Sequence, residues 1–316
     1  MPRLALHVGL PKAASSTLQQ RYLSRHDEIA YFALPRKGGP PDRGDVVRDF
    51  VRSVRDEPGL AAAERLLPQV TERMTAADRK LALFSEERLT GHFGAGVGAK
   101  AAFAARSFPG ASVILVIRHP RKLLVSNYAQ HLRYPRPHLP TVPGLARWLE
   151  EGLGSTRGPV HYAEGVSIGN IAEVWTEAFG PRVIPVVFEE LVRAPVQAMT
   201  RLARRLEVRA EPFVALAATP ASAVNAAPRP LAMAVMRRTQ TWTGRPRRAA
   251  SLLVRAAGGL PGTPRPLTPD LSRRIDRHYA GQCDKAARIL GLDLARWGYP
   301  TAGPAEVWPP PDRWIA

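Results

Sequence analysis

The chain has 316 residues but only one cysteine, Cys283, so it cannot form an internal disulfide. Disulfides are typical of oxidising compartments, and their absence fits a reducing one. Aromatic residues make up only 7% of the sequence. They are not interleaved with the basic residues, and neither zinc-ligand spacing nor an RNA-recognition motif is present. We therefore expect no nucleic-acid partner and no metal.

Long apolar runs are also missing. No stretch approaches the roughly 20 uninterrupted apolar residues that a membrane-spanning helix needs. Residues 1–3 lead into a short apolar run over 4–10, and Lys12 follows without a small-residue cleavage site. A secretory signal would need such a site. We therefore expect no transmembrane span and a cytoplasmic location.

Acidic residues are few relative to basic ones. Lysine and arginine number 45 against 27 aspartate and glutamate, which gives a net charge of +18. A positive field attracts anions such as nucleotide phosphates, nucleic acid or an acidic lipid surface. The same charge also arises when the arginines of an Arg-, Ala- and Pro-rich chain simply solvate helix faces. Charge alone therefore selects no partner.

Hydrophobic residues reach 45%, enough for a sizeable buried core. Short apolar runs alternate with helical patterns, which predicts an α/β fold with a mostly parallel sheet. We expect one three-layer, P-loop-like domain over residues 1–316, with a central parallel sheet and helices on both faces. The predicted strands cover 4–8, 81–84, 112–117 and 183–188, and the predicted helices begin after Ser15 and after Pro120 and span 167–179 and 195–206.

A long C-terminal helix is predicted from Thr268, a plausible N-cap, with Pro269 at the first helical position. Its apolar face includes Tyr279 and Cys283, so the cysteine is interpreted as a small buried residue and not as a nucleophile.

Two stretches interrupt these patterns. Residues 133–164 are rich in proline and glycine and are predicted to form a loop or lid. Residues 212–269 form an Arg-rich, helical segment with eight arginines and no acidic residue. Two interpretations of this segment stay open: a solvated basic segment, or one that contacts a nucleotide, an anionic acceptor or an anionic lipid surface.

The first motif with chemical content is HVGLPKAASSTLQ, residues 7–19. It consists of a strand, a tight loop with a lysine, three hydroxyl residues and a helix. Backbone N–H groups at such a helix start hold anions, and the lysine adds a point charge. The Walker pattern is absent, and an ordinary capped turn is the alternative. The predicted phosphate-binding residues are Lys12, Ala13, Ala14, Ser15, Ser16 and Thr17.

The second motif lies at the end of the strand predicted over 112–117. Arg118 ends this strand, Pro120 begins a helix, and Ser126 lies about two turns along it. The carboxyl end of a strand in an open α/β sheet faces the ligand crevice, and a guanidinium suits phosphate recognition. A strand-end arginine in a salt bridge is the alternative.

Together the two motifs resemble those of the sulfotransferase family that uses 3′-phosphoadenosine-5′-phosphosulfate (PAPS). The family carries P-K-x-G-[ST]-[ST] for the 5′-phosphosulfate, and R-[NHD]-P with a serine eight residues after the arginine for the 3′-phosphate. The sequence PKAASS at 11–16 matches the first pattern, with Ala14 in place of the usual glycine. Arg118 and Ser126 match the second. FEEL at 188–191 and LARWGY at 294–299 resemble further family features.

This resemblance implies sulfuryl transfer from PAPS, without a metal, to a hydroxyl or amine of a small-molecule, carbohydrate or lipid acceptor. Lys12 is then a catalytic residue as well as a nucleotide ligand. Relatives use a histidine or a glutamate as the base. Glu86, which follows a predicted strand, is the favoured base, with Glu87 and His92 as alternatives. We expect its carboxylate to lie beside Lys12 and to stay ionised. A P-loop-type kinase and a non-catalytic anion- or nucleic-acid-binding protein are the competing interpretations.

Overall fold

The computed structural model describes residues 3–13, 15–33, 46–54, 59–90, 96–133, 142–153, 166–219, 230–239, 252 and 267–302. Its centre is a parallel sheet of five strands in the order β2-β3-β1-β4-β5. The strands are β1 (Arg3–Gly9), β2 (Ile29–Ala33), β3 (Leu81–Ser85), β4 (Ser112–Ile117) and β5 (Val183–Val187). All four predicted strands are confirmed, and β2 is an edge strand that the sequence patterns missed.

Continuous apolar runs explain why the inner strands are buried. β3 is buried at every position, and β4 at every position after its first residue. A parallel strand covered on both faces needs such a run, because neither side meets water. In the register of the sheet, His7 of β1 lies opposite Ser85 of β3 and Ile114 of β4. The carboxyl ends of these three neighbouring strands therefore meet at one edge.

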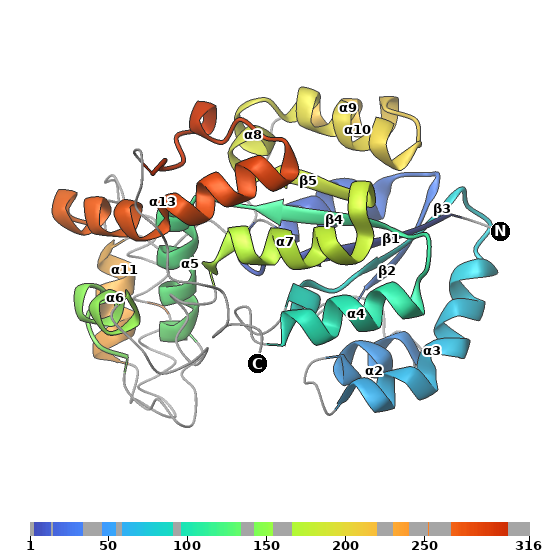
Figure 1. Cartoon of the computed structure of the whole chain (residues 1–316), viewed down its shortest axis with the longest axis horizontal. Helices are drawn as coiled ribbons and strands as arrows, with labels where there is room; N and C mark the ends of the chain where they lie inside the picture. The colour runs from blue at the N-terminus through green and yellow to red at the C-terminus, as the bar shows by residue number, and fades with distance from the viewer. Residues whose placement is uncertain are drawn as a thin grey trace.

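Helices cover both faces of the sheet (Figure 1). One face carries α3 (Leu60–Thr75), α4 (Val97–Ser107) and α7 (Ile168–Phe179), as right-handed crossovers between successive strands require. The other carries the short helices η1 (Leu18–Tyr22) and η2 (Leu23–Arg25), with α10 (Glu211–Ala218) beside η1. The predicted three-layer arrangement is thus confirmed. The remaining helices are α1 (Ser15–Thr17), α2 (Val46–Ser53), η4 (Glu87–Thr90), α5 (Pro120–Arg133), α6 (Leu145–Leu153), η7 (Gly180–Arg182), α8 (Phe188–Arg193), α9 (Pro195–Leu206), α11 (Pro230–Arg238), α13 (Pro269–Leu290) and η8 (Ala295–Trp297).

The C-terminal helix α13 begins as the sequence predicts. The side chain of Thr268 accepts a hydrogen bond from the backbone N–H of Leu271 at 3.2 Å, and Pro269 is the first helical residue. Gly291, with φ of 63°, ends the helix in a left-handed conformation that glycine adopts without cost. Cys283 is buried among core residues, and burial raises the pKa of its thiol. Its interpretation as a packing residue is confirmed.

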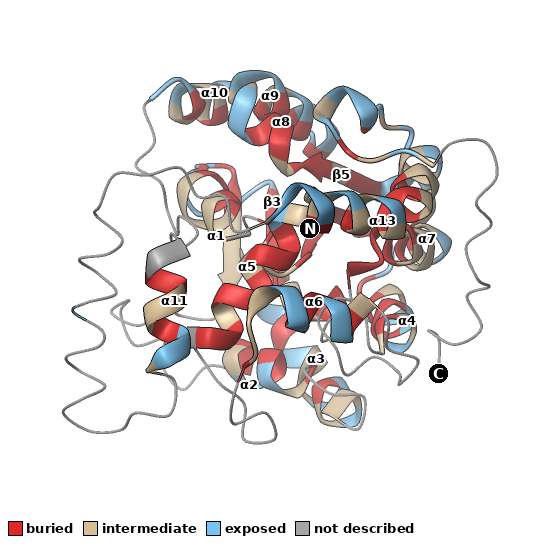
Figure 2. Cartoon of the chain, turned by 90° about the vertical axis from the view of Figure 1, so that its left-hand side faces the viewer, coloured by how far each residue is buried: buried red, intermediate tan, exposed pale blue. Residues whose placement is uncertain are grey.

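The stretch predicted as a loop or lid is more ordered than expected. Residues 145–153 form α6, so a loop assignment is wrong there. Trp148 is buried, and its indole N–H donates to Nδ1 of His131 on α5 at 3.3 Å. The sequence pattern missed this helix because glycine and proline surround a short apolar stripe. α5, which lies beneath α6 and α11, is buried over much of its length (Figure 2). Residues 134–141 and 154–165 lie outside the described residues, and a lid function stays a prediction.

Within the Arg-rich segment, the structure describes α10, α11 and the start of α13, which agrees with its expected helical character. Most of its arginines lie outside the described residues. Arg237 and Arg238, in the last turn of α11, are exposed.

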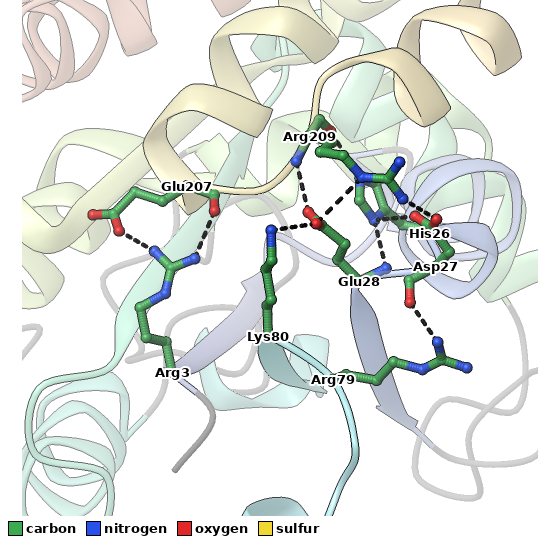
Figure 3. Close-up of polar contacts among 8 residues, drawn as sticks. All are labelled: Arg3, His26, Asp27, Glu28, Arg79, Lys80, Glu207 and Arg209. Carbon is green, nitrogen blue, oxygen red and sulfur yellow. Dashed lines mark hydrogen bonds and ion pairs between the residues drawn. The ribbon is translucent and has the colours of Figure 1, made fainter.

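Charged residues gather at the amino ends of the strands, the edge opposite the predicted site (Figure 3). Glu28, just before β2, accepts hydrogen bonds from Lys80 and from the backbone and side chain of Arg209. These contacts lower the pKa of its carboxyl to about 2. Arg3, at the start of β1, pairs with Glu207 at the end of α9. The contacts tie the loop between α9 and α10 to the sheet, so we interpret this cluster as structural.

Candidate functional site

The loop after β1 has a backbone shape that its sequence explains. Gly9 adopts φ of 111°, and a Cβ there would lie 2.9 Å from the carbonyl oxygen of Glu87. Only glycine therefore allows η4 to pack so closely against this loop. The backbone N–H of Leu10 donates to the carbonyl of Val116 at 2.9 Å, and Ala13 closes a turn onto Leu10 at 3.1 Å. The loop is thereby fixed between β4 and η4.

Lys12 itself adopts the left-handed conformation, with φ of 65°. Such a backbone is uncommon for a residue with a side chain, and strained residues of this kind cluster at functional sites. Ala14 lies outside the described residues, as does the side chain of Ser15. Ser16 and Thr17, half-buried on α1, follow the loop directly. All predicted ligands of the first motif that the structure describes thus lie in one turn beyond β1.

Arg118 joins the second motif to the first. Its Nη1 donates to the backbone carbonyl of Lys12 at 2.6 Å, across 106 residues of sequence. The guanidinium lies 4.4 Å from the centre of the Phe188 ring, a cation–π contact. Its Nε is buried without a hydrogen-bond partner among the described residues. Burial lowers the pKa of Arg118. The arginine therefore has an anchored position and one donor, Nε, without a partner among the described residues, and a guanidinium held in this way suits an anion.

Ser126 lies on α5, half-buried, about two turns after Pro120. The predicted helix is confirmed, because α5 begins at Pro120. The assignment of Ser126 to a 3′-phosphate stays a prediction.

Glu86 follows β3 immediately and is only 4% exposed. One carboxylate oxygen accepts a hydrogen bond from the backbone N–H of Arg88 at 2.9 Å and lies 3.4 Å from its Nε. The expectation that this carboxyl stays ionised in the ordinary way is wrong. Burial raises its pKa to about 7, although Arg88 and the buried Lys100 oppose that shift. Such a pKa is well matched to proton transfer near neutral pH.

The alternatives to Glu86 differ in their positions. Glu87 begins η4 and is half-buried, and its carbonyl faces the Gly9 loop. His92 lies outside the described residues. The choice of Glu86 as the base remains a prediction.

A buried polar chain beneath the loop was missed by sequence reasoning. Gln19 donates to Oγ of Ser85 at 2.9 Å, and Nδ1 of His7 lies 2.7 Å from the same oxygen. His7 is fully buried, and burial lowers its pKa to about 4, so it is neutral at pH 7. A neutral, buried histidine supports packing and does not supply charge to an anion. His7 and Ser85 lie near the ends of two predicted strands, and these two polar residues were the sequence signal that could have indicated the buried polar contacts.

The weaker sequence features meet beside Arg118. Glu189, just after β5, accepts a hydrogen bond from the Tyr299 hydroxyl at 2.7 Å. His119 bonds to the carbonyl of Gly298 at 2.9 Å, as expected for a strand-end histidine satisfied by backbone. Thus FEEL at 188–191 and LARWGY at 294–299, far apart in sequence, both reach the turn that follows β4.

The described residues also bear on membrane insertion and metal binding. None of their helices is long and apolar enough to cross a membrane. Within the same residues, no group of three or more His, Cys, Asp or Glu side chains is placed to hold a metal ion.

Comparison with known proteins gives a structural likeness only. No family model matches the chain, and no curated protein matches its sequence. A sulfotransferase from Alicyclobacillus acidocaldarius superposes with a TM-score of 0.56 at 19% identity, covering 94% of this chain and 99% of that one. A mouse sulfotransferase complexed with PAP (3′-phosphoadenosine-5′-phosphate) superposes with a TM-score of 0.48 at 14% identity, covering 93% of this chain and 87% of that one. A sulfotransferase domain from the curacin biosynthetic pathway superposes with a TM-score of 0.42 at 14% identity, covering 93% of this chain and 99% of that one. The chain therefore has the fold of a sulfotransferase.

Proposed function

We propose that this chain, with its sulfotransferase fold, transfers a sulfuryl group from PAPS to an acceptor hydroxyl or amine. The observation that carries the proposal is the hydrogen bond from Arg118 to the Lys12 carbonyl. It joins the two sequence motifs that resemble the 5′-phosphosulfate and 3′-phosphate sites of PAPS-dependent enzymes. Both motifs lie at the carboxyl ends of adjacent parallel strands, where open α/β sheets bind ligands.

The nucleotide would be held by cationic and hydroxyl groups from both motifs. Lys12, Ser16 and Thr17 would bind the 5′-phosphosulfate, and Ala13, Ala14 and Ser15 would complete the loop. Arg118 would offer its guanidinium to the 3′-phosphate, and Ser126 would add a hydroxyl. Because Arg118 is half-buried and anchored at Lys12, little side-chain entropy is lost on binding.

The reaction would be an in-line displacement at sulfur. The acceptor oxygen or nitrogen forms a bond to sulfur while the bond from sulfur to the bridging phosphate oxygen breaks. The acceptor proton passes to Glu86, and the electron pair of the broken bond remains on the departing 5′-phosphate of 3′-phosphoadenosine-5′-phosphate (PAP). Lys12 stabilises that developing charge. Positioning and electrostatics therefore supply most of the rate enhancement.

The acceptor belongs to a broad chemical class: a small molecule, carbohydrate or lipid that carries a hydroxyl or amine. Acceptor pockets on this scaffold are formed by connecting loops, which vary most between proteins of one fold. The segments over 133–164 and 212–269 are the candidates for that role.

Nucleotide selectivity tests the proposal. We expect the protein to bind PAP at least tenfold more tightly than AMP or ATP, because Arg118 and Ser126 act on the 3′-phosphate that only PAP carries. Isothermal titration calorimetry with the three nucleotides measures this ratio. Equal affinity for PAP and AMP would contradict the role of the second motif, and tighter binding of ATP would favour the kinase interpretation.

A further inference from the structure

The residues that follow α13 hold the turn from which α5 begins. Nδ1 of His119 accepts a hydrogen bond from the backbone N–H of Arg121 at 3.2 Å, so its Nε2 carries the proton that bonds to the Gly298 carbonyl. The ring of Tyr299 lies against the same imidazole, with ring centres 5.3 Å apart. The bond to Gly298 spans 179 residues of sequence. The C-terminal segment thus touches the residue next to Arg118.

Glu189 provides a second connection to this turn. It is 1% exposed and accepts hydrogen bonds from the Tyr299 hydroxyl at 2.7 Å, from Lys122 at 3.3 Å and from the backbone N–H of His119 at 3.4 Å. The Tyr299 bond is the shortest of the three. Burial and the Glu189 charge raise the pKa of Tyr299 well above its usual value, so its hydroxyl keeps the proton that it donates. A buried carboxylate needs such donors to stay in place.

Arg118 directly precedes His119 in the chain and contacts Phe188 and Lys12. The Phe188 ring lies 4.4 Å from its guanidinium, and the Lys12 carbonyl accepts from its Nη1. The negative charge of Glu189 acts on Arg118 as well, since it raises the pKa of the guanidinium against the effect of burial. Glu189 is nevertheless bonded to Tyr299, Lys122 and the His119 backbone. Its oxygens are therefore occupied by groups other than Arg118.

We propose that Tyr299 is a positioning residue that, through Glu189 and His119, keeps Arg118 available for the 3′-phosphate and so determines nucleotide selectivity. The inference rests on the proposed function. Without the Tyr299 hydroxyl, Glu189 loses its shortest hydrogen bond and is freed to pair with the nearby guanidinium. An Arg118 paired with Glu189 has fewer donors for a ligand phosphate. The Nη1 bond of Arg118 to the Lys12 carbonyl is kept in this proposal, so contacts of the first loop to the 5′-phosphate should change less than those to the 3′-phosphate.

Tyr299→Phe tests this, because it removes only the hydroxyl. By calorimetry, we expect PAP affinity to fall about tenfold, the scale of one hydrogen bond to a charged group, while AMP affinity changes by less than about twofold. The matched control is Tyr279→Phe, which removes another buried tyrosine hydroxyl, on α13. It should leave the ratio of PAP to AMP affinity unchanged.

A second variant changes the contact between Arg118 and Phe188. Phe188→Leu removes the aromatic ring but keeps an apolar residue, and it should reduce the same ratio. An equal loss of PAP and AMP affinity in both variants, or an unchanged ratio, would overturn the positioning role. The wild-type protein separates this from failure of the proposed function: a lack of preference for PAP over AMP there contradicts the proposed function before any variant is made.

Discussion

Replacing Glu86 with glutamine is expected to reduce the rate of sulfuryl transfer by about 100- to 10,000-fold, the range that a general base contributes. The carboxylate is the proton acceptor in the proposed reaction, and glutamine cannot take up that proton. Glutamine keeps the size of the side chain and an oxygen that accepts from the backbone N–H of Arg88. PAP affinity should therefore change by less than about twofold. Steady-state rates and calorimetry on the same preparations separate the two quantities.

The pH dependence of the transfer rate independently tests the role of Glu86 as the base. Because burial raises its pKa to about 7, the wild-type rate should fall about tenfold for each pH unit below that value, and the variant should lack this limb. The folded-state pKa lies above the ordinary value of 4.5. Burying this carboxyl therefore costs stability progressively as pH rises from about 4.5 to about 7, and the loss is complete above that range. At pH 8, Glu86→Gln should unfold at the same or a higher temperature than the wild type.

The matched control is Glu87→Gln, which removes the next carboxylate along the chain. Its effect on the rate should be less than about threefold, because adjacent residues that leave a strand point in different directions. If Glu86→Gln were fully active and Glu87→Gln or His92→Ala were inactive, the role of general base would be assigned to Glu87 or His92. Full activity in all three would mean that the acceptor reacts without a protein base.

Replacing Lys12 with alanine should reduce turnover by about 100- to 1,000-fold, the cost of losing one group that stabilises developing charge. The affinity for PAP should fall less, by about tenfold or below, because the charge on the leaving phosphate oxygen develops fully only in the transition state. Turnover and PAP affinity of the variant measure these two losses.

Arg106→Ala is the charge-matched control for Lys12→Ala. This arginine is exposed in the last turn of α4 and forms an ion pair with the exposed Glu64 at 3.3 Å. Its removal lowers the net charge by the same amount and should change turnover by less than about twofold. Equal losses of rate and affinity in Lys12→Ala would make Lys12 a simple binding residue.

Much of the fold could be predicted because its strands are continuous apolar runs. β4, SVILVI, is buried after its first residue and leaves no ambiguity of type or length. β2 was missed because it is an edge strand, in which only Ile29 is buried and Tyr31 and Phe32 are half-buried. α6 was missed for a different reason: Trp148 and Leu149 become a helix face only once α5 and α13 are present to cover them.

The candidate site was predictable in its local motifs but not in its long-range contacts. The motifs around Lys12 and Arg118 were predicted from the sequence as phosphate sites, and a hydrogen bond joins them in the structure. The ionisation of Glu86 could not be predicted, since it depends on burial by elements distant in sequence. Likewise, nothing local to Tyr299 indicates that its hydroxyl bonds to Glu189, 110 residues away.

Transfer of radiolabelled sulfur from PAPS tests the central claim most directly. The full chain is incubated with ³⁵S-labelled PAPS and a cell extract, and the products are separated and identified. We expect a labelled organic product, stoichiometric release of PAP, and loss of both in Lys12→Ala. Tight binding of PAP without any labelled product, and without PAP release above that of Lys12→Ala, would contradict the assignment of this chain as a sulfotransferase.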